Sequence, residues 1–133
     1  MSFLLDTDTC SHHLRQSSGL AHRFIQHTGR LFIPTIVLAE LYVWVYHRDD
    51  PTHGIATMDR FIRHEVQVLP FDERCAHEFG RVRGRLLRQG ISVSRMDLMI
   101  ASVAIVHDLT LVTHNTADFR FIPGLRLDDW LAG

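Results

Sequence analysis

The sequence predicts an α/β fold in which a parallel sheet of four to five strands is covered by helices on both faces. Short apolar runs bounded by turn residues are typical of strands buried in such a sheet. Longer segments with apolar residues at helical spacing separate these runs. Strands that alternate with helices form right-handed βαβ units, which place helices on the faces of a parallel sheet.

Four apolar runs are predicted as strands, and a shorter one as an edge strand. The first run, Phe3-Leu4-Leu5, is the most uniformly apolar and is therefore expected at the centre of the sheet. The later strands are predicted at residues 31–33, 66–69 and 109–113, with the edge strand at 125–127. Pro34 and Pro70 are expected to end the second and third strands, because proline cannot donate to a strand ladder.

Helices are predicted from capping residues and from apolar spacing. Three are expected over residues 36–47, 73–89 and 95–107, with the caps Thr35, Asp72 and Ser94. Two shorter helices are predicted at residues 20–27 and 55–64. A further helix should begin within residues 7–11 and be broken by Gly19, while residues 114–119 form a loop or a single helical turn.

Length and composition bound the class of protein. The chain has 133 residues, 46% of them hydrophobic, which suits one domain over residues 1–133. No apolar run approaches the roughly 18 residues of a membrane span, and no basic segment precedes an apolar one as in a signal peptide. Cys10 and Cys75 provide no disulfide framework, so we expect reduced thiols in a cytoplasmic protein.

The charges are nearly balanced, with a formal net charge of −1, and all 14 basic residues are arginine. Lysine is absent, which excludes any mechanism that needs a catalytic lysine. Arg81, Arg85 and Arg88 share one helical face by their spacing. This stripe is interpreted either as a solvated face or as a surface that follows a phosphate backbone, since the planar guanidinium fork binds phosphate.

Three carboxylates occur in surroundings that are otherwise apolar. Asp6 ends the first predicted strand, Glu40 is the only charged residue in residues 31–46, and Asp97 is the only one in residues 96–106. Both of these segments are apolar nearly all round, which predicts buried helices. A buried carboxylate either protonates or finds a cation.

These acids, together with Asp118 after the fourth strand, lie near element ends that can face one cleft of a doubly wound sheet. At ~5 Å separation and an effective dielectric of about 20, each pair of carboxylates repels by roughly 3 kcal/mol. A cluster of Asp6, Glu40, Asp97 and Asp118 therefore needs protonation or a bound cation. Hard oxygen ligands favour Mg²⁺ or Mn²⁺, and such an ion commonly serves phosphoryl chemistry.

The acids near helix starts also have structural interpretations. Asp97 follows Ser94 by three residues, as in a capping box, and Asp118 follows Asn115 at the same spacing. Asp8 is expected to cap a helix rather than to ligate an ion.

Glu40 lies in mid-helix, where it caps nothing, and its structural alternative is an ion pair with an arginine. The same helix carries Tyr42, Trp44 and Tyr46, which are expected in the core or in a dimer contact rather than in a base-stacking platform.

Four segments have the order and spacing of a known family. They are Leu4–Thr9, Ile33–Leu41, Asp97–Ala101 and Leu111–Phe119, and a closing Pro123-Gly124-Leu125 with Trp130 also fits. The segments resemble PIN-domain proteins, and specifically the VapC ribonuclease toxins of type II toxin–antitoxin modules. The resemblance spans essentially the whole chain.

The resemblance implies a three-layer α/β/α PIN-like fold around a parallel sheet. It implies Mg²⁺- or Mn²⁺-dependent cleavage of RNA, often tRNA or rRNA, that leaves a 5′-phosphate and a 3′-hydroxyl. It further implies a homodimer and a cognate VapB-like antitoxin whose tail covers the active site.

The resemblance also assigns site residues. Asp6, Glu40 and Asp97 correspond to the family's acidic ligands, and the fourth position is assigned to Asp118 with Asn115 as helper. Asp6 and Asp97 would hold the metal directly. Glu40 would ligate it or orient the attacking water, and Asp118 would bind through water or support a second metal.

Three further residues are predicted helpers. Thr7 or Thr113 would hydrogen-bond a phosphate or a ligand carboxylate. Asp8 stands where many family members have asparagine, and it would add a fifth acid near the metal.

Three alternatives remain open at this point. A haloacid-dehalogenase-type phosphatase opens with an apolar strand followed by an Asp-x-Asp motif, which Asp6-Thr7-Asp8 satisfies, but that class requires a lysine. A non-catalytic PIN-like interaction module would have an incomplete acid site. The substrate could be DNA, because no residue here is seen to read a 2′-hydroxyl, and only the resemblance favours RNA.

Overall fold

The computed structural model describes residues 1–15 and 19–131, and its strands form one sheet in the order β3-β2-β1-β4-β5. The strands are β1 (Phe3–Leu5), β2 (Leu31–Pro34), β3 (Gln67–Leu69), β4 (Thr110–Val112) and β5 (Leu127–Asp128), and all neighbours pair in parallel. β1 is central, as predicted from its apolarity. Phe3 pairs with Leu31 on one side, and Leu5 pairs with Val112 on the other.

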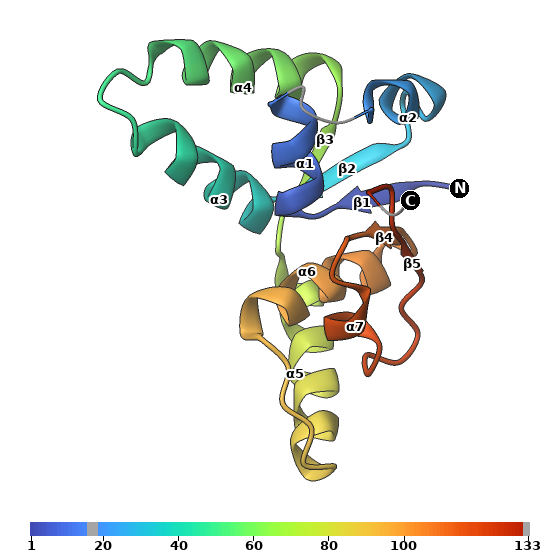
Figure 1. Cartoon of the computed structure of the whole chain (residues 1–133). Coiled ribbons are helices and arrows are strands. Elements are labelled where there is room, and N and C mark those ends of the chain that lie inside the picture. Colours follow the sequence, from blue (N-terminus) through green and yellow to red (C-terminus); the bar gives the residue numbers. More distant parts are fainter. Residues whose placement is uncertain (16–18, 132–133) are drawn as a thin grey trace.

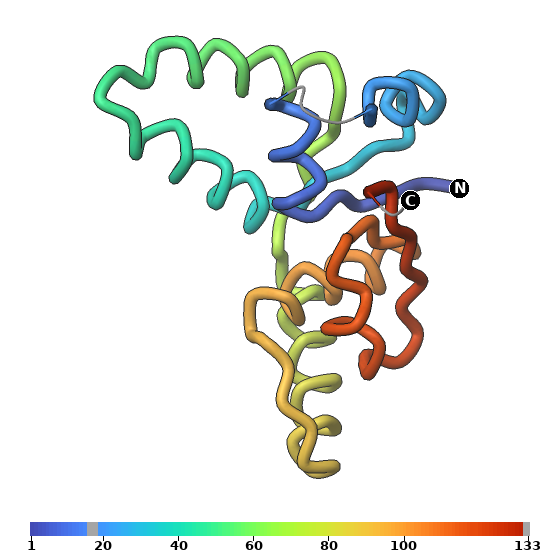
Figure 2. Tube along the Cα trace, in the orientation of Figure 1, coloured from blue at the N-terminus to red at the C-terminus, as the bar shows by residue number. Residues whose placement is uncertain are grey.

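The helices form a layer on each face of the sheet. They are α1 (Thr7–Leu14), α2 (Ala21–Gln26), α3 (Thr35–Tyr46), α4 (Thr52–His64), α5 (Glu73–Arg88), α6 (Arg95–Val106) and α7 (Thr116–Phe119). The first four lie above the sheet in Figure 1 and the last three below it. Figure 2 shows the same separation along the chain trace. The predicted three-layer α/β/α fold is confirmed.

The strand order explains this separation. The connections from β1 to β2 and from β2 to β3 step across the sheet in one direction, whereas the connections from β3 to β4 and from β4 to β5 step in the other. Right-handed crossovers that step in opposite directions place their helices on opposite faces. The reversal leaves a topological switch point between β1 and β4, where ligands bind in such folds.

The core is densest at the central strand and at α6. Leu4 and Leu5 of β1 are fully buried, and α6 is buried along most of its length. Trp130, near the end of the chain, closes the core beside β1. Its ring lies 5.3 Å from that of Phe3 and stacks on His27 at 5.5 Å. Cys10 and Cys75 are buried free thiols, as predicted.

The predicted burial of α3 is wrong for its C-terminal half. Val43, Trp44 and Tyr46 are 67%, 53% and 63% exposed, although Val37, Leu41 and Val45 on the same helix are buried. Apolarity all round the helix therefore reflects one face against the core and another at the surface.

Several predicted boundaries also differ. Thr35 is not a cap but the first residue of α3, and its hydroxyl accepts a hydrogen bond from the Phe71 N–H (3.2 Å). α4 begins at Thr52 rather than Ile55, because the Asp50 carboxylate accepts a hydrogen bond from the Thr52 N–H (3.0 Å).

Other ends lie within a few residues of their predicted places. α1 ends at Leu14 before the predicted break at Gly19, and residues 16–18 lie outside the described part of the chain. The edge strand is Leu127–Asp128 rather than residues 125–127. Among the described helices, none combines the length and the apolarity that crossing a bilayer requires.

Candidate active site

Asp6 lies at the switch point of the sheet, directly after the central strand. Its backbone N–H donates to the Val112 carbonyl (3.2 Å), and its carboxylate accepts from the Thr9 N–H (2.9 Å) as the N-cap of α1. The residue is 7% exposed. Burial raises the pKa of the Asp6 carboxyl, and hydrogen bonds from Thr9 and Thr113 oppose this rise.

The prediction that Asp8 caps the first helix is wrong, because β1 ends at Leu5 and Asp6 takes the cap position. Asp8 instead lies in the first turn of α1 and is exposed. Its negative charge adds to the rise in the pKa of Asp6.

Glu40 projects from the middle of α3 toward the start of α1. Its Oε1 accepts a hydrogen bond from the Thr7 hydroxyl. None of the ion pairs found in the described residues joins Glu40 to an arginine, so the ion-pair alternative is not supported. Thr7 thus supports a candidate ligand carboxylate, one of the two roles predicted for it.

Asp97 lies in the first turn of α6 and is half-buried. Ser94 caps that helix by accepting from the Asp97 N–H (3.3 Å), so the capping prediction holds for Ser94. Burial raises the pKa of the Asp97 carboxyl most, followed by the negative charges of other carboxylates, which in order are Asp118, Asp6, Glu40 and Asp8. Five acids from separate parts of the sequence therefore act on one another.

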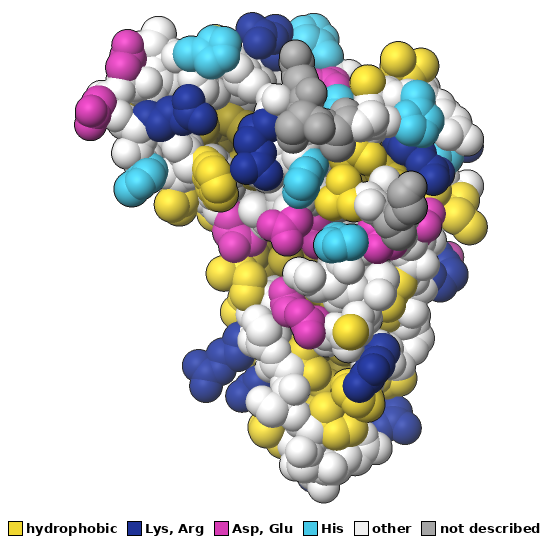
Figure 3. Space-filling view, in the orientation of Figure 1, with side chains coloured by type: hydrophobic (Ala, Val, Ile, Leu, Met, Phe, Trp, Pro, Cys, Tyr) yellow, Lys and Arg dark blue, Asp and Glu magenta, His cyan; other side chains and the backbone are white. Residues whose placement is uncertain are grey.

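The predicted acids from α1, α3 and α6 open onto one cavity of about 140 Å³. Its lining residues are Asp6, Thr7, Asp8, Glu40, Met96, Asp97, Ile100, Asn115 and Phe119. Figure 3 shows acidic side chains in a band across the middle of the molecule, where the two helical layers meet.

The residues after β4 contribute in different ways. Asn115 lines the cavity, whereas Asp118 lies on α7, is exposed and is outside the lining. Asp118 nevertheless exerts the largest carboxylate effect on the pKa of Asp97. Thr113 is buried and hydrogen-bonds both Asp6 and the Asn115 N–H, the latter at 3.0 Å.

The carboxylates share the cavity without converging on one point. In residues 1–15 and 19–131, no three His, Cys, Asp or Glu side chains are already arranged to hold a metal ion. Asp6 is held by its cap hydrogen bond and Glu40 by Thr7. The donor chemistry fits a hard divalent ion, and ligation by the whole set requires side-chain rotation.

Sequence reasoning missed the apolar wall of the cavity, formed by Met96, Ile100 and Phe119. Ile100 follows Asp97 by three residues on α6, so helical spacing alone places it on the same face. Phe119 closes α7 and is buried.

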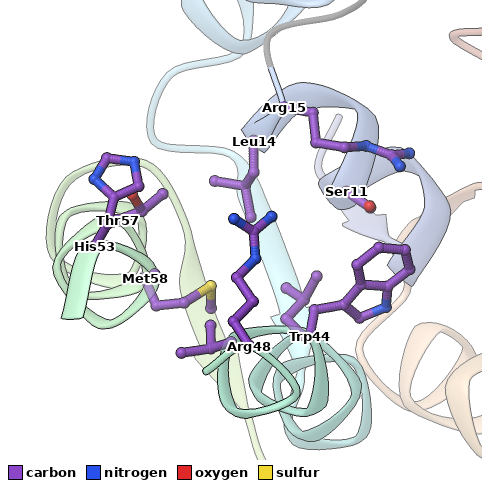
Figure 4. A pocket seen from close by; sticks show the side chains of 11 residues that line it. Ser11, Leu14, Arg15, Trp44, Arg48, His53, Thr57 and Met58 are labelled. Atoms are coloured by element: carbon purple, nitrogen blue, oxygen red, sulfur yellow. The ribbon is translucent and has the colours of Figure 1, made fainter. Parts of the chain in front are cut away.

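A larger cavity of about 350 Å³ lies between α1, α3 and α4 and has no carboxylate in its lining. Leu14, Trp44 and Met58 surround the side chain of Arg48 there (Figure 4). The guanidinium of Arg15 lies over the Trp44 ring at 5.5 Å. Its apolar and cationic lining suits a binding surface rather than hydrolytic chemistry.

Comparison with known proteins agrees with this site and this fold. The PIN domain family model matches residues 3–124. The tRNA(fMet)-specific endonuclease VapC of Salmonella typhimurium is 34% identical over 131 residues, covering 98% of each chain. The chain belongs to the VapC family of PIN-domain ribonucleases. The recognition predicted from the four sequence segments is confirmed.

Solved structures of VapBC proteins have the same fold as this VapC-family chain. The DNA-bound VapBC structure from Salmonella typhimurium contains a chain with a TM-score of 0.90 and 34% identity, with 98% of both chains covered. VapBC2 from Rickettsia felis, bound to a fragment of promoter DNA, gives a TM-score of 0.85 at 29% identity, covering 98% of this chain and 99% of that one. Family membership leaves no support for the phosphatase alternative.

Proposed function

We propose that this VapC-family protein is a toxin that hydrolyses RNA phosphodiesters with Mg²⁺ or Mn²⁺ held by Asp6, Glu40, Asp97 and Asp118. The observation that carries the proposal is the raised pKa of Asp97, to which the other three acids contribute. Carboxylates from α1, α3 and α6 at one switch point are a set of hard oxygen donors. A bound divalent ion would polarise the scissile phosphate and acidify a water.

The chain's own groups take distinct roles in the proposed reaction. Asp6 and Asp97 would hold the ion directly, and Asp118 would act through water or at a second ion, with Asn115 as helper. Glu40 would ligate the ion or orient the attacking water, with Oε1 kept in place by Thr7. Attack in line on phosphorus, without a covalent enzyme intermediate, would leave a 5′-phosphate and a 3′-hydroxyl.

The proposed substrate class is RNA, with tRNA as the first candidate, because a relative that is 34% identical is named as a tRNA(fMet)-specific endonuclease. This activity would be exerted in the cytoplasm. Incubation with total tRNA, with rRNA and with single-stranded DNA, followed by mapping of the 5′ ends, tests the choice. Cleavage of DNA alone would contradict it.

Metal binding is tested without reference to activity by following the melting temperature during a Mn²⁺ titration. A ligand at 100 times its Kd stabilises the folded state by about 2.7 kcal/mol. We expect such a shift for the wild-type protein and its loss in Asp97→Asn. A wild-type protein that shows no shift at millimolar Mn²⁺ would instead be the inert interaction module.

We also propose a VapB-like antitoxin as partner, because the related solved structures are VapBC complexes. The larger cavity suits a segment with apolar side chains flanked by carboxylates that pair with Arg15 and Arg48. Trp44→Ala should weaken binding of the co-expressed antitoxin while leaving RNA cleavage unchanged. Loss of both together would indicate misfolding rather than a lost contact.

A homodimer is proposed through a different face of α3. Val43 and Tyr46 are three residues apart, exposed and apolar, and they point away from the cavity that Trp44 lines. Val43→Glu should shift the mass measured by light scattering from dimer to monomer. An unchanged dimer would place the contact elsewhere.

A further inference from the structure

One stretch of the chain, residues 79–96, is strongly cationic. It carries five positive charges and no acidic residue, in Arg81, Arg83, Arg85, Arg88 and Arg95. Since the formal net charge of the chain is −1, the remainder carries −6. We name residues 79–96 the basic arm.

The basic arm leads from one end of the molecule to the acidic cavity. It comprises the C-terminal part of α5, the connection over residues 89–94 and the first two residues of α6. In Figure 1 the connection forms the tip opposite α4 and then runs back beside α5 to the start of α6. Arg95 is followed directly by Met96 and Asp97, which both line the cavity.

Three arginines of the arm have charges that the protein does not use. Arg81 is paired with Glu78 at 2.5 Å, but Arg85, Arg88 and Arg95 are exposed. In the described part of the chain, these three donate no side-chain hydrogen bond and form no ion pair.

A merely solvated helix face normally mixes both signs of charge. The α4 surface does so, since Arg63 pairs there with Asp59 at 3.0 Å. The basic arm instead presents one sign only, which is the electrostatic footprint of a polyanion site.

An RNA substrate needs cations outside the cavity. The cavity itself is lined by carboxylates, which repel a polyanion. Residues 88 and 95 are separated by at most about 25 Å of extended chain, a span that covers several backbone phosphates. Arginine binds each phosphate through a planar fork of donors and stays charged at any working pH.

We propose that the basic arm binds the RNA backbone on one side of the cleaved bond, through Arg85, Arg88 and Arg95. The inference rests on the proposed function and adds to it the surface that holds the substrate. Phosphate contacts carry no sequence information, so the arm sets affinity and salt dependence while the cavity sets the chemistry.

The test compares Arg85→Gln/Arg88→Gln/Arg95→Gln with a control of equal charge change, Arg30→Gln/Arg60→Gln/Arg63→Gln. Binding of a fluorescently labelled single-stranded RNA is measured by anisotropy in excess EDTA, from 50 to 200 mM salt. Each lost phosphate contact on a single strand lowers the slope of log K against log salt by ~0.7, so the arm variant should lose about 2 units. The control should keep the wild-type slope.

Cleavage kinetics and metal binding provide the second readout. The arm variant should show a raised KM for long RNA with little change in kcat, and an unchanged Mn²⁺-induced melting shift. A wild-type salt slope in the arm variant, or an equal loss in the control, would overturn the inference while leaving the nuclease proposal intact. If the wild-type protein neither binds nor cleaves RNA, the proposed function itself fails.

Discussion

Replacing Asp6 by asparagine separates the two tasks that this residue performs. The carboxylate caps α1 by accepting from the Thr9 N–H, and it is the proposed metal ligand at the end of β1. Asparagine caps helices about as well as aspartate, so Asp6→Asn should keep the fold. We expect metal binding and RNA cleavage to be lost, because even residues behind the direct ligands contribute about 10- to 100-fold.

Asp6→Ala is the matched control, since it removes the cap as well as the ligand. Loss of an N-cap costs about 1 kcal/mol. For a chain of this length that corresponds to a melting temperature lower by roughly 3–5 °C. Both variants should lack the Mn²⁺ shift, but only the alanine variant should be less stable in EDTA.

The pH dependence of stability gives the sign of the effect. The pKa of Asp6 is raised in the folded protein by burial, so the folded state holds this proton more tightly than the unfolded chain. Stability therefore falls as pH rises from 3.8, the ordinary pKa of an aspartate side chain, through the raised value, and the loss persists above it. Asp6→Asn removes this loss and should be the more stable protein at neutral pH in EDTA.

Urea unfolding at several pH values, with cleavage of end-labelled tRNA in parallel, measures both effects. An Asp6→Asn protein that cleaves RNA at the wild-type rate, or that keeps the Mn²⁺ shift, would refute the role of Asp6 as a ligand. A variant that is less stable than wild type at neutral pH would refute the claim that the buried charge is destabilising.

Three further predictions concern other contacts. Thr7→Val removes the hydroxyl that holds Glu40 and should lower cleavage about 10- to 100-fold, with recovery in Thr7→Ser; equal activity of the two variants would contradict this role. Trp130→Ala should lower the unfolding free energy by about 3–5 kcal/mol in urea titrations, because the ring packs in the core beside Phe3. Cys10 is fully buried with a raised pKa, so it should react with a thiol reagent only after unfolding, and rapid reaction in the native state would contradict its burial.

The sequence predicts strands and chemistry here better than helix ends. Short apolar runs have little freedom to be anything but buried strands, so β1 and its central place follow from composition. The start of α4 was missed because its cap is the turn residue Asp50, whereas apolar periodicity begins only at Ile55. Likewise, of Asp6 and Asp8, the capping residue is decided by where β1 ends.

Tertiary partners account for what remained unpredicted in the site. Thr7 and Glu40 are 33 residues apart, and only the packing of α1 on α3 brings their side chains together. The apolarity of α3 did not distinguish Leu41, which faces the core, from Val43, which faces outward. Such a difference depends on which neighbours exist, and it is not encoded in the local pattern.

The central position of β1 has a consequence for biosynthesis. This strand is made first, yet its partner β4 begins only at Thr110, so one edge of β1 stays unpaired until most of the chain has been translated. At 5–20 residues per second, that wait lasts about 5–20 s. Asp97 emerges late as well, and the nascent polypeptide therefore stays harmless to the ribosome that produces it until its synthesis is nearly complete.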